Sequence, residues 1–422
     1  MLADALVGDQ KCLQVHSISL QDNQLIDQSV ANLFDRASPT LCQSLRNVHI
    51  ENNRIGPKAI NSITAVLAES LKNFSGGSIW APSLSICNNP LEVGGLKVLK
   101  DEISASKLVN LVNLSLCGSL TSDADTNAEL VLALGSGHCH SLKELNLSRN
   151  NLGEPGGKAL GKILAHLHSG VSLWLEETML GDKGISAFAQ NVEGTCVLEE
   201  VDFENNCIHA AGLSCFAEYV CAGKILTSFC LSFANNPLGL EGVIVFARML
   251  SSCYSQFEFL DLSGCQLTTG ESNTTSAAST DSVQTPTCIG DAEQLICSQS
   301  QSFRSSPIIS LAISNNNFTG DRISVLKCFV YMCPCLVFLY CDNCGINSSD
   351  LEQLNFKLSM LNVKLPECVS WRDYHSQFTT RENNMEKCNL KEKIPNLSHQ
   401  VCHNNYMHVF LYVSSYNQSA CR

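Results

Sequence analysis

The sequence is short of positive charge and has no long apolar run. Its 422 residues hold 27 lysines and arginines against 40 aspartates and glutamates, which gives a formal net charge of −13. A chain of that sign repels a phosphate backbone, so we expect no direct nucleic-acid binding and a protein partner with a basic surface. A membrane-spanning helix needs about 18 or more consecutive apolar residues. No stretch approaches that length, so we predict no membrane contact.

Motifs for catalysis and cofactor binding are also missing. The sequence has no phosphate-binding or dinucleotide-binding glycine loop, no zinc-protease helix motif and no nucleophile elbow. We therefore predict a non-catalytic protein without cofactor or metal. No secretory signal is visible in MLADALVGDQKC, so the 23 cysteines are expected to be reduced and mostly buried, in an intracellular protein.

Two groups of cysteines and histidines nevertheless have suggestive spacing. Cys333, Cys335, Cys341 and Cys344 form a C-x-C and a C-x-x-C pair, a pattern that can bind zinc. His138, Cys139 and His140 could contain a nucleophile and a base, but no third orienting group accompanies them. We interpret both groups as structural, because the repeat described next already explains Cys341 and Cys344.

A repeat with the pattern L-x-x-L-x-L-x-x-N-x-L runs along most of the chain. Its clearest copy is formed by Leu142, Leu145, Leu147, Asn150 and Leu152. The Asn-type position recurs at residues 23, 53, 89, 119, 150, 178, 206, 236, 265, 316 and 344. Eight of the ten gaps between these positions lie between 28 and 31 residues, which indicates one structural unit used eleven times.

Each unit is long enough for one strand and one helix. The two leucines of L-x-L point to the same side of a strand, the Asn ends that strand, and a helix with apolar spacing of three and four follows, as at 158–164. Strands stack about 4.8 Å apart whereas helices need about 8–10 Å, so the array must bend with its helices outside. The pattern resembles the ribonuclease-inhibitor-like leucine-rich repeats, which implies an α/β solenoid, a horseshoe with a parallel sheet on the concave face and helices on the convex face.

The repeats divide the chain into four segments. Residues 10–267 hold repeats 1–9, residues 268–306 form a Ser/Thr-rich loop insertion, residues 307–362 hold repeats 10–11, and residues 363–422 are an irregular or disordered tail. The insertion is either a phosphorylated regulatory loop or a tolerated surface loop, with a short helix expected near 291–297. The first repeat starts close to Met1 without a polar cap, which we interpret as a sign of a longer parent protein.

The outward strand positions of the later repeats carry aromatic and acidic residues. A large aromatic side chain among carboxylates has the composition of a binding hot spot for a basic protein. A merely solvated acidic surface is the alternative, and Trp174 favours the binding interpretation. The candidate partner-binding residues are Trp174, Glu176, Glu177, Glu200, Asp202, Glu204, Phe229, Phe259, Asp261 and Tyr340.

Four sequence features are similar to the C-terminal repeats of the Tonsoku-like proteins, which are DNA repair scaffolds: CNNPL at 87–91, LSLCGSLTSDAD at 114–125, ANNPL at 234–238 and LDLSGC at 260–265 followed by an insertion. The resemblance implies a nuclear scaffold for protein binding at damaged replication forks and double-strand breaks. The ankyrin repeats of that family are absent from this sequence. The alternative is a cytoplasmic regulator, either an immune-type sensor or a GTPase activator acting through Arg46 or Arg54.

Overall fold

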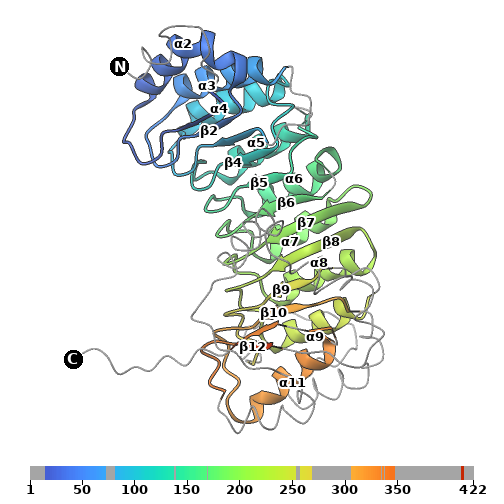
Figure 1. Ribbon diagram of the computed structural model, residues 1–422. Coiled ribbons are helices and arrows are strands. Elements are labelled where there is room, and N and C mark those ends of the chain that lie inside the picture. Colours follow the sequence, from blue (N-terminus) through green and yellow to red (C-terminus); the bar gives the residue numbers. More distant parts are fainter. Residues whose placement is uncertain are drawn as a thin grey trace, which may run out of the picture. The chain divides into compact units, whose positions relative to one another are not determined.

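The computed structural model describes residues 15–72, 81–136, 139–168, 170–252, 257–268, 306–333, 335–336, 338–346 and 410–412 (Figure 1). The chain forms two compact units, Met1–Pro237 and Leu238–Arg422. Most of the predicted insertion at 268–306 lies outside the described residues, as does the tail at 363–422 apart from a short strand. None of the described helices is both long and apolar enough to cross a membrane.

The first unit alternates short strands with helices, as the repeat pattern predicts. Every strand pairs in parallel with the next strand along the chain. The strands are β1 (Ser17–Ser19), β2 (Asn47–His49), β3 (Ser83–Ser85), β4 (Asn113–Ser115), β5 (Glu144–Asn146), β6 (Val171–Trp174), β7 (Cys196–Asp202) and β8 (Ile225–Ser232). The helices are α2 (Asp27–Ser44), α3 (Pro57–Leu71), α4 (Glu92–Ser104), α5 (Ala124–Ser136), α6 (Gly153–Ile163), α7 (Gly181–Gln190) and α8 (Ala210–Cys221), and the 3₁₀ helix η1 (Leu164–His166) extends α6.

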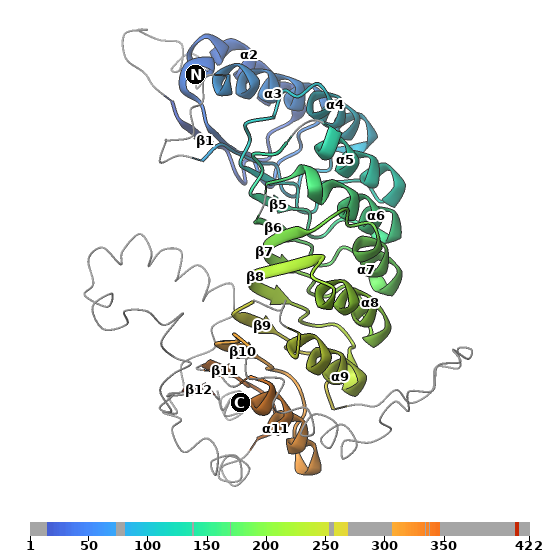
Figure 2. The ribbon, with the colours of Figure 1, turned by 90° about the vertical axis from the view of Figure 1, so that its right-hand side faces the viewer.

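Strands and helices of the first unit form two layers. Helices α2–α8 stack along one side, and β1–β8 lie along the other (Figure 2). Because packed helices need about twice the spacing of paired strands, the helices lie on the convex side and the sheet on the concave side. The predicted α/β leucine-rich-repeat solenoid is therefore confirmed.

The core lies between the two layers and consists of the leucines of the repeat. Leu145 of β5 and Leu147 just after it are fully buried. Between β7–β8 and α7–α8 the core is aromatic: the ring of Phe203 lies 5.6 Å from that of Phe216 and 5.2 Å from that of Phe233. Edge-to-face and tilted contacts of this kind add to the area that the rings bury.

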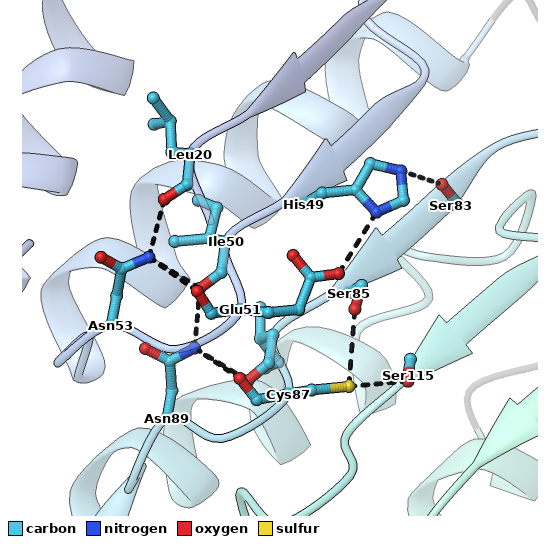
Figure 3. Close-up of polar contacts among 11 residues, drawn as sticks. Leu20, His49, Ile50, Glu51, Asn53, Ser83, Ser85, Cys87, Asn89 and Ser115 are labelled. Atoms are coloured by element: carbon cyan, nitrogen blue, oxygen red, sulfur yellow. Dashed lines mark hydrogen bonds and ion pairs between the residues drawn. The ribbon is translucent and has the colours of Figure 1, made fainter. Parts of the chain in front are cut away.

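The Asn that follows most strands of the first unit ties neighbouring repeats together. The side-chain nitrogen of Asn206 donates hydrogen bonds to the carbonyl oxygens of Leu175 (2.6 Å) and Phe203 (3.1 Å), in the preceding repeat and in its own. Its Oδ1 accepts the backbone N–H groups of Thr178 and Leu180, each at 3.1 Å. Asn53 and Asn89 make the same kind of carbonyl contacts (Figure 3). The amide therefore satisfies buried backbone groups that no strand partner reaches.

One residue before the Asn-type position, the backbone adopts the left-handed conformation. Asn52 has φ 56°, Asn88 φ 54° and Gly118 φ 60°. Asn and Gly tolerate this region best. A Cβ at Gly118 would also meet the Asn88 Oδ1 at 2.7 Å, so the Asn88 side chain would have to move.

Several helices are capped from the repeat before them. The Asp27 carboxylate in α2 accepts the N–H groups of Gly56 (2.9 Å) and Ala59 (2.7 Å) at the start of α3. The Asp182 carboxylate in α7 accepts the N–H groups of His209 (2.7 Å) and Gly212 (3.1 Å) at the start of α8. A carboxylate at a helix N-terminus satisfies orphan donors and suits the helix dipole.

The second unit repeats the same design. Its elements are α9 (Gly239–Leu250), β9 (Phe259–Asp261), β10 (Ser310–Ala312), η3 (Gly320–Arg322), α11 (Ile323–Met332), β11 (Phe338–Tyr340) and β12 (Phe410–Tyr412). The strands pair in parallel in that order. Asn316 again links repeats, because its side-chain nitrogen donates to the carbonyls of Leu262 (2.9 Å) and Ile313 (2.8 Å).

Candidate functional site

The strand face of β5–β8 brings several of the predicted binding residues together. Trp174 at the end of β6 pairs in register with Asn146 of β5 and Asp202 of β7. Asp202 pairs in turn with Ser232 of β8. Trp174 and Asp202 are therefore neighbours on adjacent strands.

Carboxylates surround Trp174 on these strands and on the turns that follow them. We call this surface the acidic face and define it as Trp174 with Glu144, Glu176, Glu177, Glu200, Asp202 and Glu204. One guanidinium lies against it. The Arg149 Nη2 is 3.8 Å from the Glu176 Oε1, and its Nε is 3.7 Å from the Glu177 Oε2. Carboxylates thus outnumber the cation, and the face has a negative potential.

Solvent exposure of these residues differs from what the sequence suggests. Trp174 and Glu204 are half-buried and Glu177 is exposed, whereas Glu176, Glu200 and Asp202 are buried. The expectation that all of these side chains face water is wrong for the last three. Asp202 is only 2% exposed, and its Oδ1 accepts the N–H of Glu204 at 2.9 Å.

Arg149 and Glu177 occupy strained positions in their turns. Arg149 has φ 59° and Glu177 has φ 54°, at the place where the neighbouring repeats have Gly118 and Asn205. A long charged side chain gains nothing from the left-handed region, and such a conformation costs of order 1 kcal/mol. These two turns therefore present charge at the edge of the acidic face at the expense of local stability.

Phe229 lies in a bulged part of β8. The register between β7 and β8 shifts between Leu198 and Glu200, which leaves Phe229 37% exposed. A bulge redirects side chains at the point where the extra residue enters the strand. The predicted outward orientation of this aromatic residue is confirmed.

The remaining predicted residues belong to the second unit. Phe259 and Asp261 of β9 are buried, and Tyr340 of β11 is half-buried. The Asp261 Oδ1 accepts the N–H of Ser263 at 2.8 Å, which is the same turn contact that Asp202 makes. The expectation that Phe259 and Asp261 face water is therefore wrong, and their role in partner binding stays a prediction.

The candidate metal and catalytic residues lie in structural positions. Cys333, Cys341 and Cys344 are buried and Cys335 is half-buried. Burial raises the pKa of Cys344 to about 12. Among the residues that the structure describes, no three His, Cys, Asp or Glu side chains gather to hold a metal ion. Cys139 is buried and His138 lies outside the described residues.

The two arginines considered for a GTPase activator differ in setting. The Arg46 Nη1 donates to the carbonyl oxygens of Leu45 (2.9 Å) and Ser70 (2.8 Å), which are structural contacts within the repeat. Arg54 is exposed.

A second polar cluster, on β2–β4, is one that the sequence reasoning missed. The His49 Nδ1 lies 3.4 Å from the Glu51 Oε1, and the Cys87 sulfur lies 2.8 Å from the Ser115 hydroxyl (Figure 3). The hydrogen bond from its Nδ1 to the Glu51 carboxylate raises the pKa of His49. Cys87 and Cys117 each stand two residues after the end of a strand, β3 and β4 respectively. Because these positions are equivalent in successive repeats, the sequence alone could have predicted that the two cysteines are neighbours.

Comparison with known proteins agrees with this geometry. A family model described as "Leucine Rich repeat" matches residues 138–161 and 196–217, which contain β5–α6 and β7–α8. The pig (Sus scrofa) ribonuclease inhibitor is 28% identical over 169 residues. The chain thus contains leucine-rich repeats that are similar to those of the ribonuclease inhibitor.

Other similarities of this leucine-rich-repeat protein are more distant. A Tonsoku-like protein from cattle (Bos taurus) is 26% identical over 268 residues. The matches cover 40% and 60% of this chain but only 36% of the ribonuclease inhibitor and 18% of the Tonsoku-like protein. Among solved structures, the crystal structure of the Rad7 and Elc1 complex in yeast is similar at 15% identity with a TM-score of 0.38, over 78% of this chain and 75% of that chain.

Proposed function

We propose that this leucine-rich-repeat protein is a protein-interaction scaffold whose acidic face binds a basic segment of another protein. The observation that carries the proposal is the placement of Trp174 among six carboxylates on β5, β7 and the turns that follow β6 and β7. A half-buried indole offers a large apolar surface with little entropy to lose, and the carboxylates around it select a cationic partner.

The turns of the acidic face support this proposal. Arg149 and Glu177 keep charged side chains in a left-handed conformation that Asn or Gly would adopt more easily. Charged side chains that are kept in a strained backbone conformation are typical of functional surfaces. Phe229, exposed beside β7, adds a second aromatic contact at the edge.

The similarity to a Tonsoku-like protein gives the proposal a more specific form. In this form the chain is the repeat part of a nuclear scaffold in replication-fork or double-strand-break repair. The alternative is a cytoplasmic regulator, such as a GTPase activator or an immune-type sensor. Arg54 would be the residue for GTPase activation, because Arg46 is engaged with backbone carbonyls.

Substitution of Trp174 tests the binding role. We expect Trp174→Ala to weaken binding of a labelled Lys- and Arg-rich peptide by at least about 2 kcal/mol, roughly 30-fold in Kd. Fluorescence anisotropy gives the Kd, and a Glu- and Asp-rich peptide of the same length is the matched ligand control. Glu177→Gln with Glu204→Gln should also weaken binding, whereas Glu154→Gln on the exposed side of α6 should not.

The control variants make the result interpretable. Val93→Ala removes an exposed apolar side chain (65% exposed) from α4 and should leave the Kd unchanged. Circular dichroism confirms that each variant is folded. An unchanged Kd for Trp174→Ala, or an equal loss for Glu154→Gln, would rule out the acidic face. Capture from nuclear and cytosolic extracts with wild type and Trp174→Ala then separates a repair partner from a cytoplasmic one.

A further inference from the structure

Two free thiols, Cys87 and Cys117, lie beside each other on the strand face of the first unit. The hydrogen bonds of the sheet continue past the ends of β3 and β4: Ile86 N–H donates to the Ser115 carbonyl (3.0 Å), and Asn88 N–H donates to the Cys117 carbonyl (2.7 Å). Cys87 is therefore next to Cys117 on the neighbouring chain segment. Paired strands run about 4.8 Å apart, within the separation of about 4.4–6.8 Å that a disulfide needs between its Cα atoms.

The surroundings of the two thiols favour one of them as the reactive thiolate. The Cys87 sulfur lies 2.8 Å from the Ser115 hydroxyl and 3.5 Å from the Ser85 hydroxyl (Figure 3). Hydrogen bonding from the Cys117 thiol, together with those two hydroxyls, lowers the pKa of Cys87 to about 6. The same hydrogen bond, with burial, raises the pKa of Cys117. A thiolate is the nucleophilic form of cysteine, so Cys87 attacks first.

Charged groups border the pair on both sides. His49 and Glu51 lie on the β2 side, and Arg149 and Glu176 lie beyond Cys117. Both cysteines are half-buried. Other cysteines, such as Cys139 and Cys333, are buried in the core, where burial raises the pKa of Cys139 to about 11.

We infer that Cys87 and Cys117 form a thiol modification site that reacts with small disulfides such as oxidised glutathione and closes to a disulfide between neighbouring repeats. The Cys87 thiolate attacks one sulfur of oxidised glutathione, forms a mixed disulfide and releases one glutathione thiolate. Once Cys87 carries glutathione, its sulfur no longer accepts the hydrogen bond from the Cys117 thiol. The Cys117 proton therefore passes to the released glutathione thiolate. Cys117 then attacks the Cys87 sulfur and releases the second glutathione. The two protein thiols are oxidised, and oxidised glutathione is reduced to two thiols.

Mass spectrometry of the full chain after treatment with oxidised glutathione tests this inference. We expect peptide mapping to find a Cys87–Cys117 link in the wild type. Cys117→Ser should stop at a mixed disulfide of Cys87 with glutathione, and Cys87→Ser should leave Cys117 unmodified. Cys207→Ser, which removes an exposed cysteine in a different turn, should still give the link.

Two outcomes would overturn the inference. One is a wild-type protein in which Cys87 stays a free thiol while the exposed Cys207 is glutathionylated. The other is a mixed disulfide at Cys87 that persists in the wild type although Cys117 is present. The wild-type map decides by itself, so a misfolded variant cannot hide the answer. The inference does not depend on the acidic face, and failure of either proposal leaves the other intact.

Discussion

At the scale of single residues, an Asn side chain in many of the repeats satisfies backbone groups of two repeats. Asn206 donates to the carbonyls of Leu175 and Phe203 and accepts the N–H groups of Thr178 and Leu180, and it is fully buried. Loss of a buried partner exposes the full desolvation cost of the groups left behind. The side chain therefore contributes more to stability than its size suggests.

We predict that Asn206→Ala lowers the free energy of unfolding by about 3 kcal/mol, since several buried backbone groups lose partners at about 1–3 kcal/mol each. Urea denaturation followed by circular dichroism measures the change, and the amide hydrogens of Thr178 and Leu180 should exchange faster. Asn206→Thr should be milder, because Thr178 fills the equivalent position with a hydroxyl that bonds the Leu175 carbonyl at 2.8 Å. Asn205→Gly, at the exposed neighbour, is the control. A change below about 0.5 kcal/mol for Asn206→Ala would contradict the argument.

At the scale of elements, glycines let neighbouring helices approach closely. A Cβ at Gly157 of α6 would stand 2.1 Å from the carbonyl oxygen of Gly184 in α7. A Cβ at Gly161 would stand 2.3 Å from the Phe188 carbonyl oxygen. Both obstacles are backbone atoms, so α6 would have to move away from α7.

We predict that Gly157→Ala destabilises the first unit by about 3 kcal/mol, the upper part of the usual cost of overpacking. Gly94→Ala is the matched control, because a Cβ there meets only Pro57 Cγ at 3.8 Å on the exposed side of α4. That change should be neutral or stabilising by up to about 1 kcal/mol, since alanine is the better helix former. Thermal unfolding of both variants distinguishes the two effects, and equal melting temperatures would refute the close packing of α6 on α7.

The elements themselves could be predicted from the sequence because the same side chains recur in each repeat. The spacing of Leu145 and Leu147 indicated a strand with one buried face, and Asn150 indicated where that strand ends. Because the same order recurs from repeat to repeat, the strands were expected to pair in parallel. Burial on the strand face could not be predicted in the same way. Asp202 is buried and its carboxylate accepts a hydrogen bond from the next turn, whereas Glu177 is exposed in a left-handed turn. Both depend on local backbone geometry that alternation does not encode.

Contacts between side chains of neighbouring repeats could be predicted only in part. Cys87 and Cys117 share one register position, so the periodicity already placed them side by side, but their hydroxyl neighbours needed coordinates. The exposure of Phe229 needed the bulge between β7 and β8, which no repeat spacing reveals.

At the scale of the whole molecule, the net charge of −13 bears on how fast a basic partner arrives. Long-range attraction speeds diffusional encounter, and salt screens it over a Debye length of about 10 Å at 0.1 M. The carboxylates of the acidic face concentrate this field around Trp174. Encounter rate and residence time therefore depend on different groups, the charges for the first and the indole for the second.

We predict that the association rate constant of the Lys- and Arg-rich peptide falls by about tenfold or more between roughly 0.05 M and 0.5 M NaCl. Stopped-flow anisotropy measures this rate. Glu177→Gln with Glu204→Gln should flatten the salt dependence, whereas Trp174→Ala should keep the slope and raise the dissociation rate. Val93→Ala should change neither. An association rate that is independent of salt would mean that the acidic face does not steer its partner, and a slope that survives the double charge variant would place the steering charge elsewhere on the chain.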